Sequence, residues 1–96
     1  MDKTRPVLIL TRALARPEMN KVVVAEITST IRGTSSEVAV GPSNGLDQSS
    51  VVSCDNISTI RVASLGRLVG YLRDDQEAEL ARAMIDAFDL EHEELP

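Results

Sequence analysis

The side chains able to do chemistry in this 96-residue chain are arginines, hydroxyls and carboxylates. An arginine such as Arg5 stays charged at any working pH and can hold two phosphate oxygens at once. Thr28 can donate a hydrogen bond to a phosphate oxygen, and Asp55 could serve as a general base if it lies near a groove. Each also has an ordinary interpretation: a solvated arginine, a threonine bonded to local backbone, and an aspartate in a turn. Residue type alone therefore leaves these roles open.

Several other kinds of site are excluded or disfavoured. The single cysteine, Cys54, excludes an internal disulfide and is expected in the core. The single histidine, His92, excludes any mechanism or metal site that needs two, and its acidic surroundings predict that it is solvated. The carboxylates of Glu91–Glu94 lack a rigid scaffold for a cation. The turn at residues 41–45 lacks the lysine and helix of a phosphate-binding loop. The sequence therefore predicts neither a metal nor a cofactor.

The charge is unevenly distributed. The net charge is −5, but residues 1–73 carry +3 and residues 74–96 carry −8. A mildly basic body can meet a phosphate backbone. The acidic end is typical of a solvated surface or of an element that faces a partner.

Short β-branched runs predict a mainly β fold. The strongest run, Lys21–Thr28, contains three consecutive valines. Short strands at close spacing favour a curved, mostly antiparallel sheet that forms a small barrel. The dense turn signal at residues 41–45 separates two of these strands. The predicted strands are residues 6–11, 21–28, 36–40, 50–54, 57–61 and 68–72.

A helix is predicted from Asp74 onward, because the spacing of the apolar residues changes there to the spacing of a helix. Leu80, Met84 and Phe88 fall on one helical face that can pack on the sheet. Asp74 and Glu77 match the spacing of a capping box.

Residues 1–90 are predicted to form one domain, followed by an acidic tail at residues 91–96. No apolar run reaches the ~18 residues of a membrane span. The first residues show no secretory signal. A reduced, cytoplasmic setting is therefore expected.

The order of several segments in this sequence resembles the order found in the MazF/PemK toxins of bacterial type II toxin–antitoxin systems. No single segment is diagnostic, but their order and spacing match over roughly residues 4–90. The segments are residues 5–10 (Arg-Pro and an apolar strand), 23–29, 36–38, 45–47, 51–60 and 65–70.

This resemblance implies an SH3-like barrel with a C-terminal helix, assembled as a homodimer. It also implies a metal-independent endoribonuclease that cleaves single-stranded RNA, often mRNA, at short motifs. In that reaction the 2′-hydroxyl attacks its own phosphodiester, which leaves a 2′,3′-cyclic phosphate and a 5′-hydroxyl. The implied partner is a cognate antitoxin whose disordered tail covers the active surface.

The resemblance also assigns roles to individual residues. It implies that Arg5 stabilises the charged phosphorane, that Thr28 contacts a phosphate oxygen, and that Asp55 is the general base. Ser53 stands where some members carry an arginine as general acid, so that role is unassigned. The implied RNA-binding residues are Ser29, Arg12, Arg16 and Lys21.

Aromatic residues are nearly absent, which limits how RNA could be recognised. Proteins that bind single strands usually stack bases on aromatic rings. This chain has only Tyr71 and Phe88. Base recognition would therefore depend on hydrogen bonds from loops.

One departure from the family pattern leaves alternatives open. Family members open with a strand of about ten residues before the Arg-Pro pair, and this sequence starts close to that pair. Either the start lies downstream of the natural one, or the barrel is open along one edge, where unpaired strands favour association. A weakly active or inactive module that binds the antitoxin is the second hypothesis. A gyrase poison of the CcdB type, by analogy of fold, is the third.

Overall fold

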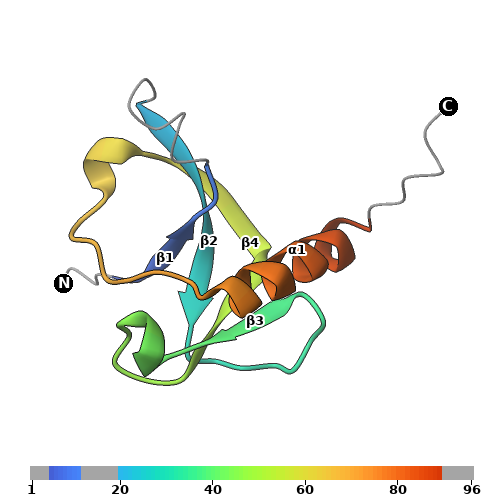
Figure 1. Ribbon diagram of the computed structural model, residues 1–96. Coiled ribbons are helices and arrows are strands. Elements are labelled where there is room, and N and C mark those ends of the chain that lie inside the picture. The colour runs from blue at the N-terminus through green and yellow to red at the C-terminus, as the bar shows by residue number, and fades with distance from the viewer. Residues whose placement is uncertain (1–4, 12–19, 90–96) are drawn as a thin grey trace, which may run out of the picture.

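The computed structural model describes residues 5–11 and 20–89, and they form one curled sheet with one helix (Figure 1). The predicted mainly β fold with a C-terminal helix is confirmed. Arg12, Arg16 and the tail that contains His92 lie outside the described residues. The elements are β1 (Val7–Ile9), β2 (Lys21–Thr28), β3 (Glu37–Val40), β4 (Ser50–Arg61), α1 (Asp74–Phe88), and the 3₁₀ turns η2 (Pro42–Asn44) and η3 (Val62–Ser64).

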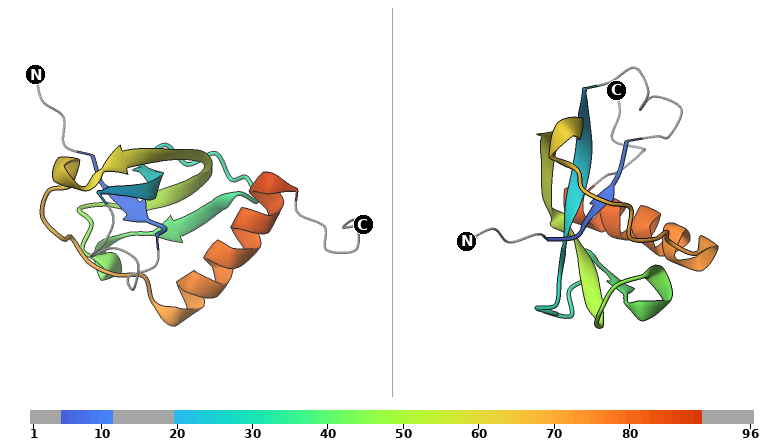
Figure 2. Two further views of the ribbon diagram at one scale, coloured as in Figure 1. Left: turned by 90° about the horizontal axis from the view of Figure 1, so that it is seen from above. Right: turned by 90° about the vertical axis from the view of Figure 1, so that its left-hand side faces the viewer.

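The described strands form an antiparallel sheet in the order β1-β2-β4-β3. The long strands β2 and β4 make its centre, and β1 and β3 are its two edges. The sheet curls strongly, and α1 crosses one of its faces (Figure 2). Within the described part of the chain the sheet therefore forms half of a barrel, open along β1.

β4 is one continuous strand, where the sequence predicted two strands separated by a turn. Ala25 pairs with Ile57 while the next residue, Glu26, pairs with Ser53. Three residues of β4, 54–56, therefore have no partner on β2 and form a bulge. The polar pair Asp55-Asn56 interrupts the apolar pattern as a turn would. The strand nevertheless continues in the same direction past the bulge.

One face of the sheet packs against α1 and forms the apolar core. Small and β-branched residues fill it, as expected for a chain with only two aromatic residues. Val38, Val52 and Cys54 are almost fully buried, and Ala83 meets them from the helix. The prediction that Cys54 is a core residue is confirmed. Leu80 and Met84 pack against this cluster as predicted, but Phe88 is 52% exposed at the end of α1.

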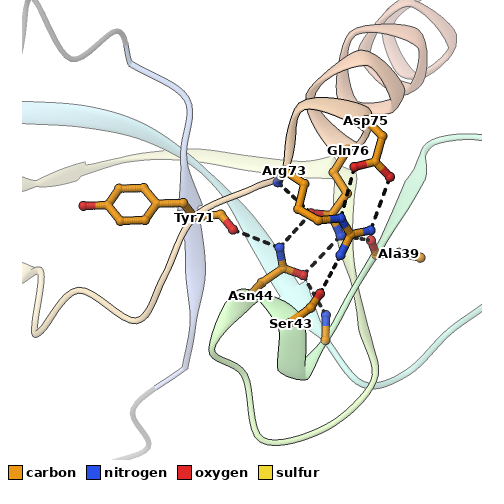
Figure 3. Close-up of polar contacts among 8 residues, drawn as sticks. Ala39, Ser43, Asn44, Tyr71, Arg73, Asp75 and Gln76 are labelled. Atoms are coloured by element: carbon orange, nitrogen blue, oxygen red, sulfur yellow. Dashed lines mark hydrogen bonds and ion pairs between the residues drawn. The ribbon is translucent and has the colours of Figure 1, made fainter.

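A buried pair of amides joins α1 to the turn that follows β3 (Figure 3). The Asn44 amide donates to Gln76 Oε1 at 2.7 Å, and the Gln76 amide donates to Asn44 Oδ1 at 3.1 Å. Asn44 also donates to the Tyr71 carbonyl, and Gln76 to the Ala39 carbonyl. The Gln76 side chain also accepts from the Arg73 backbone N–H, so it caps the helix in place of the predicted Glu77.

Glycine is required where the turn at residues 41–45 meets the segment before α1. Gly45 adopts a positive φ of 92°. A Cβ on Gly45 would overlap the carbonyl of Val69, and a Cβ on Gly70 would overlap the carbonyl of Asn44. The two backbones therefore approach more closely than any other residue type would allow.

The predicted strand at residues 68–72 is wrong. The described chain has no regular secondary structure between Leu65 and Arg73. This segment runs opposite β1 and bounds an apolar groove of about 1150 Å³. Leu68 and Tyr71 are 65% and 75% exposed. No helix in the described chain is long and apolar enough to cross a membrane.

Candidate functional site

Arg5 and Thr28 lie on neighbouring strands at the same end of the sheet. The register pairs Val7 with Glu26, and the Ile27 N–H donates to the Pro6 carbonyl at 3.3 Å. One further step along both strands places Arg5 opposite Thr28. Residues opposed in this way share one face of an antiparallel sheet and have Cα atoms about 4.5–5.5 Å apart. The fold therefore brings together two groups that are 23 positions apart in the sequence.

Thr28 and Asp55 line one polar pocket on the sheet face opposite α1. Ala25, Ile27 and Val52 point to the core, so the residues that alternate with them point to the other face. The pocket has a volume of about 180 Å³. We call it the polar pocket, and its lining residues are Glu26, Thr28, Thr30, Arg32, Thr34, Glu37, Ser53, Asp55 and Asn56.

Arg5 does not line the polar pocket. It is exposed, and it lines the end of the apolar groove beside β1. Along β2, Ile27 lines the groove and the next residue, Thr28, lines the polar pocket with Asp55, while Arg5 lies opposite Thr28 on β1. A phosphate placed over Thr28 would have a guanidinium from β1 and a carboxylate from β4 beside it.

The bulge in β4 positions Asp55. Cys54 points into the core, so the Asp55 side chain emerges on the opposite, polar face. The Ser36 hydroxyl donates to Asp55 Oδ2 at 2.5 Å, and because its single proton is used there, it accepts from the Thr34 hydroxyl at 3.1 Å. One carboxylate oxygen of Asp55 is therefore held by the β2–β3 loop.

The Cys54 thiol is not a reactive group. Burial raises its pKa, and the adjacent Asp55 carboxylate raises that pKa further. A raised pKa keeps the thiol neutral at physiological pH, and the neutral thiol is a poor nucleophile.

Glu37 organises the loop between β2 and β3. Its Oε1 accepts the backbone N–H groups of Gly33 at 2.8 Å and Thr34 at 3.3 Å, and its Oε2 accepts that of Arg32 at 3.1 Å. Gly33 has a φ of 79°, which lets three successive N–H groups turn toward one carboxylate. This loop carries Thr30, Arg32 and Thr34, so Glu37 fixes one wall of the polar pocket.

Replacing Glu37 with glutamine should loosen this loop without unfolding the sheet. Hydrogen bonds to a charged acceptor are about twice as strong as neutral ones. We expect amide exchange at Arg32 and Gly33 to accelerate about tenfold in Glu37→Gln, measured by NMR. The matched control is Glu79→Gln, on the exposed side of α1. Unchanged protection at both amides would show that the carboxylate does not hold the loop.

The residues expected to bind RNA are spread along the sheet. Ser29 is exposed directly after Thr28 but does not line the polar pocket. Lys21 is exposed at the other end of β2, about 23 Å from Thr28 at the usual rise per residue. It pairs there with Arg61, so two cations share that end of the sheet. Arg12 and Arg16 lie outside the described residues.

Sequence reasoning missed most of the lining of the polar pocket. Glu26 interrupts an otherwise apolar strand, and a carboxylate there was a signal that this part of the sheet is not simple core. The other missed residues left no local signal, because long-range strand pairing brings them together. They are Thr30, Arg32, Thr34, Glu37 and Asn56, whereas Ser53 was noted as the residue at the position of the family's general acid.

Comparisons with known proteins identify the family. A family model described as "PemK-like, MazF-like toxin of type II toxin-antitoxin system" matches residues 1–88. Endoribonuclease MazF3 of Mycobacterium tuberculosis H37Rv is 57% identical over 91 residues, covering 95% of this chain and 88% of the relative. Probable endoribonuclease MazF5 of the same strain is 36% identical over 86 residues, covering 88% and 79%.

Solved structures agree with this assignment. The Mycobacterium tuberculosis toxin MazF-mt6 has a TM-score of 0.90 and 56% identity, covering 96% of this chain and 93% of that one. A mycobacterial endoribonuclease in complex with its cognate antitoxin has a TM-score of 0.80 and 28% identity, covering 92% and 84%. The resemblance noted in the sequence is confirmed: the chain belongs to the PemK-like, MazF-like toxin family of type II toxin–antitoxin systems.

Proposed function

We propose that the chain is a metal-independent endoribonuclease that cleaves single-stranded RNA by attack of a 2′-hydroxyl on the adjacent phosphodiester. The observation that carries this proposal is the placement of Arg5 opposite Thr28, with the polar pocket beside them. The names of the similar proteins, endoribonucleases MazF3 and MazF5, support it. Such an intramolecular reaction needs no protein nucleophile, so the protein must only align the attack, stabilise charge and move protons.

Each residue has a distinct part in this proposal. Arg5 holds two oxygens of the phosphorane, because a planar guanidinium matches that geometry and keeps its charge. The Thr28 hydroxyl donates to a third oxygen. Asp55 takes the proton from the 2′-hydroxyl with the carboxylate oxygen that Ser36 does not hold. The general acid is unassigned, because Ser53 stands where some family members carry an arginine in that role.

The proposal also covers the partners of the chain, its domain organisation and its location in the cell. A cognate antitoxin would bind and inhibit the toxin, which is supported by the mycobacterial relative found in complex with its cognate antitoxin. Two copies of the chain would form a homodimer. Residues 1–90 would act as one domain with residues 91–96 as a tail. Action on mRNA would place the chain in the cytoplasm. The RNA backbone would follow Ser29, Lys21, Arg12 and Arg16.

The test uses the full chain with single-stranded RNA in an excess of chelator. We expect cleavage that leaves a 2′,3′-cyclic phosphate and a 5′-hydroxyl, identified by end-group analysis. A 2′-deoxynucleotide at the cleaved position should abolish cleavage there, because the attacking group is missing. Intact RNA under these conditions, with antitoxin binding retained, would instead identify an inactive binding module.

Replacing Thr28 with valine should slow cleavage about 10- to 100-fold. Valine keeps the shape of threonine but cannot donate to the developing charge. Thr28→Ser is the matched control. It keeps the hydroxyl and its hydrogen bond from the Thr30 N–H, which measures 3.1 Å, and should cleave within a few-fold of the parent. Single-turnover rates with a fixed RNA measure both. Equal rates for the valine and serine variants would exclude a role for the hydroxyl.

A further inference from the structure

The Asp55 side chain receives little support from the strand that carries it. Asp55 lies in the middle of the bulge at residues 54–56, which have no partner on β2. It is exposed, and its Oδ1 has no hydrogen-bond or ion-pair partner among residues 5–11 and 20–89. An exposed aspartate on an irregular strand can occupy several rotamers unless a neighbour holds it. The proposed general base therefore needs a support from outside β4.

Ser36 supplies this support from the turn before β3. Its carbonyl accepts the Cys54 N–H at 3.0 Å, and its hydroxyl donates to Asp55 Oδ2 at 2.5 Å. The backbone and the side chain of one residue therefore hold two consecutive residues of the bulge. Ser36 is 6% exposed, so bulk water has little access to either hydrogen bond. Of the residues that the structure describes, only Ser36 forms a side-chain hydrogen bond with Asp55.

A series of hydrogen bonds fixes the Ser36 hydroxyl in turn. Ser36 gives its one hydroxyl proton to Asp55, so it accepts the hydroxyl proton of Thr34 at 3.1 Å. Glu37 holds Thr34, because Glu37 Oε1 accepts the Thr34 N–H at 3.3 Å and the Glu37 N–H donates to the Thr34 carbonyl at 3.2 Å. Hydrogen bonds in such a chain polarise and strengthen one another. The start of β3 is thereby connected to one oxygen of Asp55.

We propose that Ser36 is a positioning residue for the general base, which holds Asp55 Oδ2 so that Oδ1 faces the RNA, and that Thr34 fixes the direction of the Ser36 hydroxyl. This inference rests on the proposed function. Ser36 does not line the polar pocket, so it acts on the RNA only through Asp55. Its hydroxyl keeps its own proton throughout, since Asp55 receives the 2′-hydroxyl proton on Oδ1. A base must lie within hydrogen-bond reach of that proton, and a misplacement of about 1 Å can slow a reaction about 100-fold.

The first experiment compares Ser36→Ala with Ser35→Ala in the full chain. Ser35 is the exposed neighbour in the same turn, and its side chain makes no hydrogen bond with any residue that the structure describes. With saturating single-stranded RNA, the single-turnover rate should fall about tenfold in Ser36→Ala and stay within about twofold of the parent in Ser35→Ala. Binding of an RNA with a 2′-deoxynucleotide at the cleaved position should be equal in all three proteins. The thermal midpoint checks that each variant is folded.

A double-mutant cycle with Asp55→Asn separates positioning from a general effect on the fold. Removal of a general base slows a reaction about 10²- to 10⁴-fold, so Asp55→Asn should cleave slowly. If Ser36 acts only through Asp55, adding Ser36→Ala to Asp55→Asn should slow cleavage by less than about twofold. If the double variant instead loses a further factor of about ten, Ser36 acts elsewhere and the inference is overturned.

Thr34→Val is a second variant, which keeps the test decisive if Ser36→Ala is unstable. Thr34 is exposed, and valine keeps its shape but cannot donate to Ser36. This change should slow the parent about threefold and leave the rate of Asp55→Asn unchanged. Parent rates in both Ser36→Ala and Thr34→Val, with Asp55→Asn slow, would overturn the inference and leave the proposed function intact. A parent rate in Asp55→Asn, or a chain that cuts no RNA, would refute the proposed function and this inference with it.

Discussion

Replacing Arg5 with alanine should slow cleavage of single-stranded RNA by about a thousandfold. Loss of one donor aimed at a developing charge typically lowers a rate by about 10²–10³. Arg5 combines two donors with a full positive charge, which places it at the upper end of that range. Because Arg5 is exposed and has no ion-pair partner among the described residues, the fold should not change. Single-turnover rates and the thermal midpoint of each variant measure the two effects separately.

Two further substitutions sharpen this test. Arg5→Lys keeps the charge but not the planar fork, so it should recover only part of the rate. Arg82→Ala removes an exposed arginine of α1 that pairs with Asp86 at 3.6 Å, and it should cleave at the parent rate. If Arg5→Ala and Arg82→Ala retain equal activity, the guanidinium on β1 does not act on the phosphate.

Replacing Gln76 with leucine should lower the free energy of unfolding by about 3 kcal/mol. The side chain is 4% exposed and makes hydrogen bonds to Asn44, to the Ala39 carbonyl and from the Arg73 N–H. Each polar group left buried without a partner costs about 1–3 kcal/mol. A small domain has only about 5–15 kcal/mol of stability, so this loss would be large. Urea denaturation measures it.

The reciprocal amide pair gives this prediction an internal control. Asn44→Leu should also destabilise the fold. The double variant Asn44→Leu/Gln76→Leu should lose less stability than the sum of the two single changes, because neither amide is then left without the other. Glu79→Leu, on the exposed side of α1, should change stability by less than about 0.5 kcal/mol. Strict additivity of the two single losses would show that the pair does not act as a unit.

Local sequence patterns were enough to predict the strands with strong β propensity. The strand predicted at Lys21–Thr28 has the observed bounds of β2, because three valines and an isoleucine leave no competing helical period. The helix predicted from Asp74 begins there. The order of the short segments was also enough to identify the family, because the ordered set is specific although each single motif is ambiguous.

The remaining features depend on contacts between distant segments. Asp55-Asn56 looks like a turn locally, yet pairing with β2 on one side and β3 on the other keeps β4 continuous through a bulge. Residues 68–72 are apolar enough for a strand, but no strand among the described residues pairs with them. Asn44 and Gln76 are polar residues in unremarkable positions, and only the docking of α1 makes them partners.

The polar pocket could not be predicted for the same reason. Its walls come from three strands and a loop, and the register of β2 against β4 decides which side chains face it. Glu37 follows a polar stretch that looks like an ordinary surface loop. Its three backbone hydrogen bonds become visible only when the loop is folded. Thr28 and Asp55 were proposed from the resemblance, and the geometry adds a physical reason for considering them together.

The central claim is that Arg5 and Thr28 act on one phosphodiester across the β1–β2 ladder. A double-mutant cycle tests it most directly, with Arg5→Lys, Thr28→Val and the double variant compared with the parent in single-turnover cleavage of one RNA. If both groups contact the same phosphate, the double variant should lose at least about fivefold less than the product of the two single losses, a coupling of about 1 kcal/mol. A combined loss equal to that product would mean that the two residues act independently, and would contradict the shared site.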